Sequence, residues 1–364
     1  MKERYPRLEI NLAHLKHNVA KVVEKCGSYG IQVAGVIKGA TGLPEVAKQF
    51  DEGGAAFIAS SRLEQIEDAK SAGIEKPMML IRVPMLSEVP EVIRLTDISL
   101  NSEMEVIKAL NEEARKQGKL HKVILMADLG DLREGWWDWD ELVDVAEYIE
   151  NKMVNIQLVG VGTNLGCYGS ISPTKEKLDE LVKIAEMIEA RLGRELEYIS
   201  GGATTSLMRI WDGDMPARIN LLRVGEGILL ARELDVFFDY DMSELHQDVC
   251  IMKAEVIEVK DKPSHPVGTI SVDAFGHRPT YVDRGIRKRA LLGIGKVDYG
   301  SHEDLLPKEK GVEVLGASSD HTIIDIEDAE KNWKVGDIME FDVRYPTLVY
   351  LSNCRNVNIE FINV

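Results

Sequence analysis

The chain has 364 residues, 45% of them hydrophobic, which fits a large α/β domain plus a smaller second one and argues against a coiled coil or a disordered tail. Lysine and arginine number 44 against 61 aspartate and glutamate, and the net charge of -17 disfavours binding to nucleic acid or to an anionic membrane surface. The N-terminal stretch carries scattered charges and no continuous apolar core, so we expect neither a signal peptide nor a spanning helix and place the protein in the cytoplasm.

Between residues 32 and 227, short apolar runs alternate with segments of helical period. The intervals carry stretches such as SEMEVIKALNEEARKQG (102–118), whose apolar residues recur every three or four positions. Continuous apolar runs are typical of parallel strands buried on both faces, and eight such units predict a (β/α)8 TIM-type barrel, with an open doubly wound sheet as the alternative. The runs are QVAGVIK (32–38), AAFIAS (55–60), PMMLIR (77–82), DISLN (97–101), KVILMAD (122–128), IQLVGVGTN (156–164), EYISGG (197–202) and INLLRVGEG (219–227).

After about residue 235 the helical period fades and apolar residues alternate with polar ones between Gly, Pro and Asp. We therefore predict a barrel over residues 9–235 and a C-terminal β-rich domain over 236–364. The four cysteines lie far apart without CxxC spacing, so we expect no disulfide framework and no metal site. The predicted strands of this domain are DVCIMKAEVIEVK (248–260), GTISVDAF (268–275), RALLGIG (289–295), HTIIDI (321–326) and DIMEFDV (337–343).

Lys38 ends the first apolar run and is followed at once by a glycine-rich turn. Barrel enzymes place their chemistry at the C-terminal ends of the strands. A lysine there can simply extend its charge into water. When partly desolvated, however, it has a lowered pKa, and its amine can attack a carbonyl carbon as a Schiff-base nucleophile.

The segment GGATTSL (201–207) combines flexible backbone with three hydroxyls where a helix begins. Such a turn suits a phosphate held at a helix N-terminus, although Ser and Thr are also ordinary helix caps. The candidate phosphate-binding residues are Gly202, Thr204, Thr205 and Ser206.

Three more strand ends supply polar side chains. Arg223 ends the apolar part of the last run with Gly225 after it, Arg133 follows the fifth run, and Asn164 ends the sixth. A lysine that forms an imine, a phosphate-binding turn and two arginines that can polarise a ring together match pyridoxal 5'-phosphate.

These segments resemble the alanine racemase superfamily, the fold type III pyridoxal-phosphate enzymes, over nearly the whole chain, and most of all the ornithine racemase-type amino acid racemases. The resemblance implies that Lys38 is the Schiff-base lysine and that Arg133 lies near the cofactor's phenolic oxygen or the substrate carboxylate. It also implies that Asn164 replaces a histidine packed beneath the ring and that Arg223 faces the pyridine nitrogen. The backbone at Gly225 and Glu226 would complete the phosphate site.

In the β-rich domain, GIGKVDYG (293–300) stands where typical members carry a catalytic tyrosine after glycine. The second base is therefore open, and the candidates are Lys296, Asp298, Tyr299 and His321. The resemblance further implies that Tyr350 reaches the phosphate and that residues 1–8 pair with the β-rich domain. It also implies that two subunits form a head-to-tail homodimer with shared active sites.

The reaction implied is racemisation of an amino acid, in which two groups on opposite faces remove and return the Cα proton. We expect a basic substrate, ornithine first and lysine next, consistent with the acidic residues Glu226, Asp298 and Asp320 near the predicted rim. The alternatives are an alanine or broad-specificity racemase, a non-catalytic pyridoxal-phosphate carrier, and a D-amino acid aldolase or lyase. The last would need a divalent metal, with His321 and Cys354 as its nearest ligands.

Overall fold

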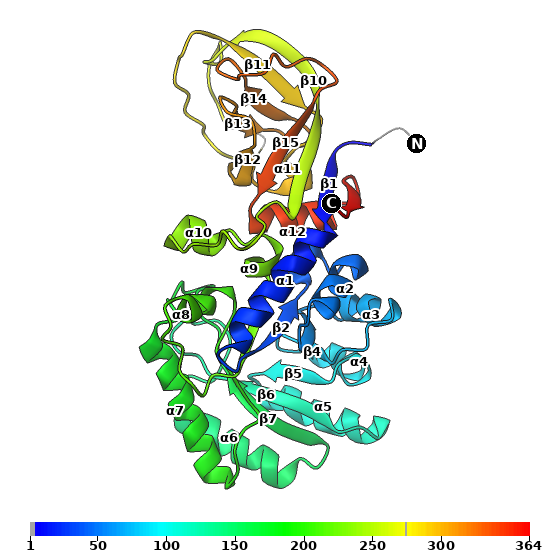
Figure 1. Ribbon diagram of the computed structural model, residues 1–364, viewed down its shortest axis with the longest axis vertical. Coiled ribbons are helices and arrows are strands. Elements are labelled where there is room, and N and C mark those ends of the chain that lie inside the picture. The colour runs from blue at the N-terminus through cyan, green and yellow to red at the C-terminus, as the bar shows by residue number, and fades with distance from the viewer. Residues whose placement is uncertain (1–3, 274) are drawn as a thin grey trace. The chain divides into compact units, whose positions relative to one another are not determined.

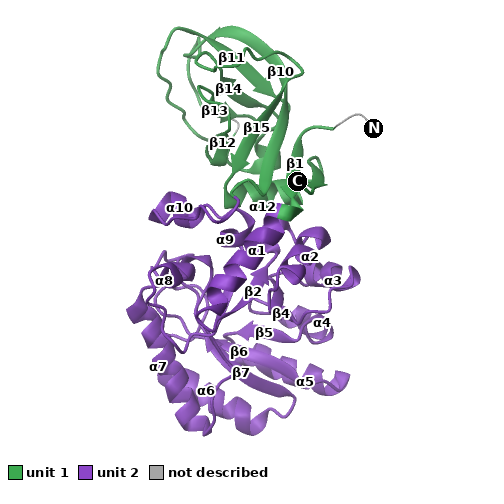
Figure 2. Ribbon diagram, in the orientation of Figure 1, with its two compact units in different colours: residues 1–13, 247–364 green, residues 14–246 purple. Residues whose placement is uncertain are grey.

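The structure is a computed structural model that describes residues 4–273 and 275–364. The chain divides into a barrel unit, residues 14–246, and a second unit made of the first residues up to 13 together with 247–364 (Figure 2). The barrel unit runs past the predicted boundary at residue 235. The buried side chain of Asn18 explains this, because its Nδ2 donates to the carbonyls of Ile228 and His246 while its Oδ1 accepts the amide of His246.

Eight parallel strands close into a barrel in the order β2 to β9 (Figure 1). Each predicted run contains one strand, so the predicted fold class is confirmed. Side chains from these strands, including Phe57, Met79 and Met126, fill the interior, so the barrel is a packed core. The strands are β2 (Gln32–Val36), β3 (Phe57–Ser60), β4 (Met78–Leu80), β5 (Ile98–Asn101), β6 (His121–Met126), β7 (Ile156–Gly162), β8 (Tyr198–Ser200) and β9 (Leu221–Val224).

Amphipathic helices surround these strands, and local chemistry sets their ends. Asp138 and Thr174 cap helix N-termini by accepting the amides of Glu141 and Lys177, and Gly118 ends another helix in the left-handed conformation. Across the described ranges, no helix is both long and apolar enough to cross a bilayer. The helices are α1 (Leu12–Gly27), α2 (Pro44–Glu52), α3 (Leu63–Ser71), α4 (Val89–Leu95), α5 (Met104–Gln117), α6 (Trp139–Lys152), α7 (Lys175–Leu192), α8 (Met208–Trp211), α9 (Glu226–Leu229) and α10 (Glu233–Phe238), with single turns η1 (Lys38–Ala40), η2 (Leu86–Glu88) and η3 (Thr204–Leu207).

The barrel wall tolerates no side chain at Gly160 in β7. A Cβ there would lie 2.4 Å from the carbonyl oxygen of Tyr198 on β8. We expect Gly160→Ala to lower the free energy of unfolding by about 1–3 kcal/mol, because β7 and β8 would have to separate. Urea titration would measure this loss. Gly27→Ala is the matched control, since a Cβ there has nothing within 4 Å; equal losses in both variants would contradict the argument.

The second unit is an eight-stranded sheet with the order β12-β15-β10-β11-β14-β13, and β1 pairs with both β10 and β16. Strand β1 (Arg7–Asn11) runs antiparallel to β10, with Arg7 opposite Lys253, and parallel to β16, with Arg7 opposite Asn358. The N-terminal segment thus pairs with strands from the other end of the sequence; residues 1–3 of the predicted segment lie outside the described residues. The other strands are β10 (Cys250–Pro263), β11 (Ile286–Leu292), β12 (Leu305–Pro307), β13 (Glu313–Ala317), β14 (Thr322–Asp325), β15 (Ile338–Val343) and β16 (Asn358–Ile362), with helix α11 (Lys296–Tyr299) and turn η4 (His302–Asp304) between them.

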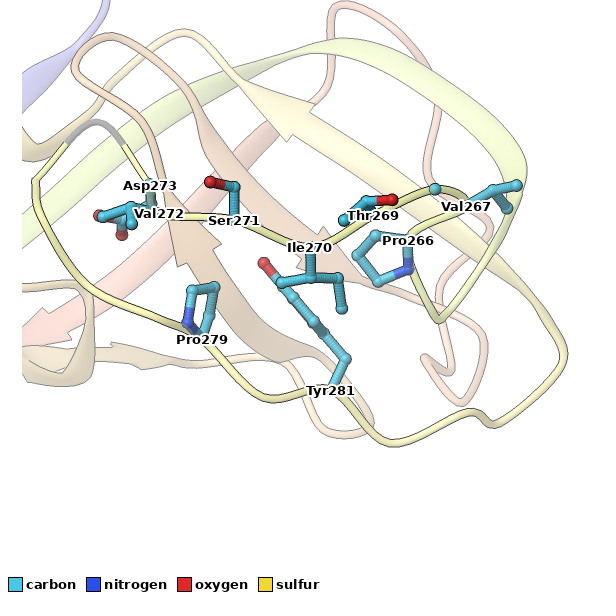
Figure 3. Close-up of a pocket in the computed structure, with 10 residues that line it drawn as sticks. Pro266, Val267, Thr269, Ile270, Ser271, Val272, Asp273, Pro279 and Tyr281 are labelled. Carbon is cyan, nitrogen blue, oxygen red and sulfur yellow. The ribbon is translucent and has the colours of Figure 1, made fainter.

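Two features of this unit differ from the predictions. The predicted strand over 268–275 is wrong for its described residues, which belong to the loop joining β10 to β11. Asp273 turns this loop by accepting the amides of Phe275 and His277, and side chains from both of its limbs, Ile270 and Tyr281 among them, line a cavity of about 200 Å³ (Figure 3). Helix α12 (Tyr345–Asn353) was not predicted, because its mostly apolar, β-branched and aromatic sequence resembles a strand.

Candidate active site

The C-terminal ends of the barrel strands carry the predicted site residues. Lys38 follows β2, Arg133 follows β6, Asn164 follows β7 and Gly202 follows β8, while Arg223 lies within β9. All strands of the barrel are parallel, so these positions meet at one rim.

Lys38 begins the turn η1 directly after β2, and its side chain is partly buried. Burial lowers the pKa of its amine, and the nearby guanidinium groups of Arg133 and Arg223 lower that pKa further, while Cys167 and Glu134 oppose the shift. The amine is therefore held out of bulk water among positive charges, which is the environment that a nucleophilic or basic lysine requires.

Arg223 is almost fully buried, with 4% of its surface exposed. Its Nη1 donates to Ser200 Oγ at 2.5 Å and its Nη2 to the carbonyl oxygen of Thr163 at 2.7 Å. Burial lowers the pKa of this guanidinium to about 10, although Glu134 opposes the shift. Strands β7, β8 and β9 thus hold a desolvated positive charge in one fixed orientation.

Arg133 lies on the loop between β6 and α6. The loop folds back on the strand, because Trp136 donates its amide to Met126 and accepts the amide of Asp128. Arg133 forms an ion pair with the adjacent Glu134, and its Nη1 donates to Cys167 Sγ at 2.9 Å. The guanidinium is thus held between its own loop and the loop after β7.

The predicted phosphate turn is held together by its own hydroxyls. Thr204 Oγ1 accepts the amide of Gly227, while Thr205 Oγ1 donates to the carbonyl of Leu165 and Ser206 Oγ to that of Gly201. Thr205 and Ser206 donate their hydroxyl protons within the fold, whereas Thr204 Oγ1 only accepts, so the Thr204 hydroxyl and the backbone amides not bonded within the turn are the groups left to meet a phosphate. Gly202 has φ of +116°, and a Cβ there would lie 2.5 Å from Ser206 Oγ.

Glu226 and Asn164 both carry a buried polar atom that has no hydrogen-bond partner among the described residues. For Asn164 it is the amide Nδ2 after β7. For Glu226 it is Oε2, whereas Oε1 accepts the amides of Arg232 and Glu233. Burial first, and then the neighbouring Glu233, raise the pKa of the Glu226 carboxyl to about 7. Glu226 thus holds local backbone through Oε1, and its contact with a substrate ammonium stays a prediction.

Two of the four candidates for the second base serve the fold of the second unit. Asp298 Oδ2 accepts the amide of Gly295, and its Oδ1 accepts from Cys354 Sγ and Asn356 Nδ2. Tyr299 is fully buried, its hydroxyl lies 2.7 Å from Thr322 Oγ1, and burial raises the pKa of its phenol to about 12. Neither side chain faces solvent, and both are hydrogen-bonded within the fold; their roles as bases, and that of Asp298 as a substrate contact, stay predictions.

Tyr299→Phe tests this structural role. We expect it to lower the free energy of unfolding by about 1 kcal/mol, since Thr322 Oγ1 loses one hydrogen-bond partner but still donates to the carbonyl of Ile294. Catalytic turnover should be unchanged. Thermal unfolding and a racemase assay on the same preparation would measure both quantities. A large fall in turnover with normal stability would instead support Tyr299 as a catalytic base.

The other candidates of the second unit are more accessible. Lys296 begins α11, and its Nζ lies 4.1 Å from the centroid of the Phe275 ring, at a cavity of about 720 Å³ that His302 and Arg289 also line. His321 is exposed in the turn before β14, and Tyr350 on α12 is 55% exposed. These residues stay predictions as participants in catalysis.

The sequence reasoning missed several groups at the barrel rim. Glu134 and Cys167 contact Arg133, and Ser200 and Thr163 receive the hydrogen bonds of Arg223. Glu134 could have been found, since it directly follows an arginine after a strand. The others depend on contacts between strands or loops that are far apart in the sequence.

The barrel, with its buried arginine and lysine at one rim, matches a known class of protein. A family model described as "Alanine racemase, N-terminal domain" matches residues 10–233, and the chain belongs to this family. It is 40% identical to the ornithine racemase of Acetoanaerobium sticklandii, over 95% of this chain and 96% of that protein. It is 41% identical to the lysine racemase of Thermotoga maritima, over 95% of each. The predicted family and enzyme class are therefore confirmed.

Solved structures agree on the fold. The alanine racemase of Streptomyces lavendulae superposes with a TM-score of 0.74 and 18% identity, covering 100% of this chain and 98% of that one. The D-threonine aldolase of Filomicrobium marinum superposes with a TM-score of 0.72 and 16% identity, covering 96% and 89%. Because racemases and an aldolase share this architecture, the fold alone does not select the reaction.

Proposed function

We propose that the protein is a pyridoxal 5'-phosphate-dependent racemase of a basic amino acid, ornithine or lysine. The observation that carries the proposal is the partly buried amine of Lys38, its pKa lowered by burial and by two arginines, in a chain about 40% identical to an ornithine racemase and a lysine racemase. The aldolase likeness is limited to the fold and does not favour a second function.

The residues at the rim fit this cofactor. Lys38 offers an amine of lowered pKa, and Arg223 offers a buried guanidinium. The buried Nδ2 of Asn164 has no partner within the described residues, and Gly202 keeps its backbone free of a Cβ, which would meet Ser206 Oγ at 2.5 Å. Lys38 would hold the aldehyde carbon, the backbone near Gly202 and Gly225 the phosphate, and Arg223 the ring nitrogen.

The chain's own residues divide the work as follows. When bound, pyridoxal phosphate makes the Cα proton of an attached amino acid acidic by accepting the electron pair left behind. The lowered pKa of Lys38 makes the neutral amine more accessible, so its Nζ is the group we propose to take that proton. Arg223 would keep a proton off the ring nitrogen, since two adjacent cations repel each other and guanidinium retains its own proton. We assign Arg133 to the substrate carboxylate, which would replace Glu134 on its Nε and Nη2.

Racemisation needs a second proton-transfer group on the other face of the substrate. We propose Lys296 for this role, with His321 as the alternative, since Asp298 and Tyr299 are used by the fold. We further propose that two copies form a head-to-tail homodimer in which each supplies Lys296 or His321 to the other. Mixing inactive Lys38→Met and Lys296→Met subunits should restore part of the activity; no recovery would count against shared sites.

The direct test is to incubate L-ornithine, L-lysine and L-alanine at equal concentration with the purified protein and pyridoxal phosphate, and to follow the loss of optical rotation. We expect ornithine and lysine to be racemised faster than alanine. Faster racemisation of alanine would sink the proposed substrate class. Retro-aldol cleavage of a D-3-hydroxy amino acid without racemisation would sink the reaction.

A further inference from the structure

We propose that Asp131 is a positioning residue that fixes Arg133 at the barrel rim by binding the loop after β7. The inference rests on the proposed function, because Arg133 is placed there as the contact for the substrate carboxylate. Asp131 acts through the backbone of Cys167 and is not itself expected to touch the substrate.

Asp131 is followed by the exposed residues Leu132 and Arg133, yet only 1% of its own surface is exposed. Both of its carboxylate oxygens are used by the loop after β7. Oδ1 accepts the amides of Cys167 at 3.2 Å and Ile171 at 3.3 Å, and Oδ2 accepts the amide of Tyr168 at 3.0 Å. A desolvated carboxylate with three amide donors is a directional attachment, since a neutral or shorter side chain would leave buried amides unpaired.

The two loops also meet at their backbones. Gly169 lies so close to Asp131 that a Cβ on it would approach the Asp131 carbonyl oxygen to 2.6 Å. Asp128 shapes the turn that presents Asp131, because its Oδ1 accepts the amides of Gly130 and Leu132, both of which have positive φ. The close approach and the strained turn show that the loop pair has one fitted arrangement.

Cys167 connects this pair of loops to Arg133. The amide of Cys167 is held by Asp131, and the thiol of the same residue accepts from Arg133 Nη1 at 2.9 Å. Arg133 in turn is the second largest influence on the pKa of Lys38, after burial. Displacing the loop after β7 would therefore release Arg133 and change the electrostatics at the amine.

The charge beside Cys167 provides a readout that needs neither cofactor nor substrate. We would measure alkylation of Cys167 by anionic iodoacetate and by neutral iodoacetamide, and take the ratio of the two rates. The ratio cancels changes in thiolate fraction and in access, so it reports the local positive charge. Cys26 and Cys250 are buried, and mass spectrometry of the peptide that contains Cys167 separates its signal from that of Cys354.

In Asp131→Glu, which keeps the negative charge but moves the carboxylate away from the three amides, we expect the ratio to fall by about threefold, toward its value in Arg133→Met, because loss of one nearby unit charge in water has an effect of this order. The kcat/KM for ornithine should fall by up to about 100-fold, as a small misplacement of a substrate-binding group can cause. Asp138→Glu is the matched control: the carboxylate of Asp138 caps α6 through the amide of Glu141 on the same loop-to-helix segment, so the ratio should not change.

Gly169→Ala also keeps the carboxylate but forces the two loops apart, and it should lower the ratio in the same way if Asp131→Glu folds poorly. An unchanged ratio in both variants would overturn the positioning role. If the ratio falls but the wild-type protein racemises neither ornithine nor lysine, the proposed function fails and the positioning stands. If the wild type is active and the ratio does not move, only the positioning fails.

Discussion

Replacing Lys38 by methionine is expected to lower the racemisation rate by about 10³-fold, which lies in the range that a general acid-base group contributes. The same change should abolish covalent retention of pyridoxal phosphate after borohydride treatment, measured as added mass on the intact protein. Both effects follow because Lys38 supplies the amine of lowered pKa after β2. The mass measurement separates loss of cofactor attachment from loss of folding.

Lys48→Met is the matched control, since Lys48 lies on α2 with its side chain 63% exposed beside Glu52. It should retain both the borohydride adduct and the activity. If Lys38→Met kept the adduct, another lysine would hold the cofactor and the assignment would be wrong. Lys38→Arg, which keeps the charge but cannot lose it, should be as inactive as the methionine variant.

Lys38→Met should lower activity but raise stability: without cofactor, the variant should unfold at a higher temperature than the wild type at neutral pH. Burial lowers the pKa of Lys38 in the folded state, so the protonated amine destabilises the fold. That cost is largest below the lowered pKa and disappears as the pH rises to the ordinary value of 10.5. The difference in Tm between variant and wild type should therefore shrink between neutral pH and pH 10.5; a constant difference would mean that packing, not charge, is responsible.

The barrel could be predicted because its signal is local and repeated. Each strand is a short apolar run, and the end of each run marks the end of a parallel strand, so the sequence alone predicts that Lys38, Arg133 and Arg223 lie at one rim. The resemblance then supplied roles that position alone could not give to these residues.

The rest of the site depends on contacts between segments that the sequence separates. Nothing adjacent to Asp131 indicates that its carboxylate binds amides of residues 167–171, and nothing near Arg223 indicates Ser200 or Thr163 as acceptors. Asp298 and Tyr299 were nominated because acidic and phenolic groups are plausible bases. In the fold both side chains are buried and hydrogen-bonded, and the burial of a single residue cannot be predicted from a short motif.

Arg223→Gln is expected to lower kcat/KM for ornithine by about 100-fold, the effect of removing one fixed charge or donor from a preorganised site. The reason is that the guanidinium is buried and oriented by Ser200 and Thr163, so no mobile group can replace it. Ser200→Ala is the matched control, because it removes one acceptor but leaves the charge and the bond to Thr163. It should cost about 1 kcal/mol in stability and little activity.

The stability of the cofactor-free Arg223→Gln protein shows whether the charge of Arg223 serves the fold or the chemistry. Its hydrogen bonds to Ser200 and Thr163 go to neutral oxygens, and burial lowers its pKa to about 10, so the charge itself disfavours folding. Glutamine removes the charge, but its amide ends two bonds short of the Nη2 that reaches Thr163, so we expect Arg223→Gln to be no less stable than Ser200→Ala, because the relief of the buried charge offsets the lost hydrogen bonds. Lower stability than Ser200→Ala with unchanged turnover would make Arg223 a structural residue. Equal or higher stability with lost turnover would mean that the fold bears a buried charge for the chemistry at the ring nitrogen.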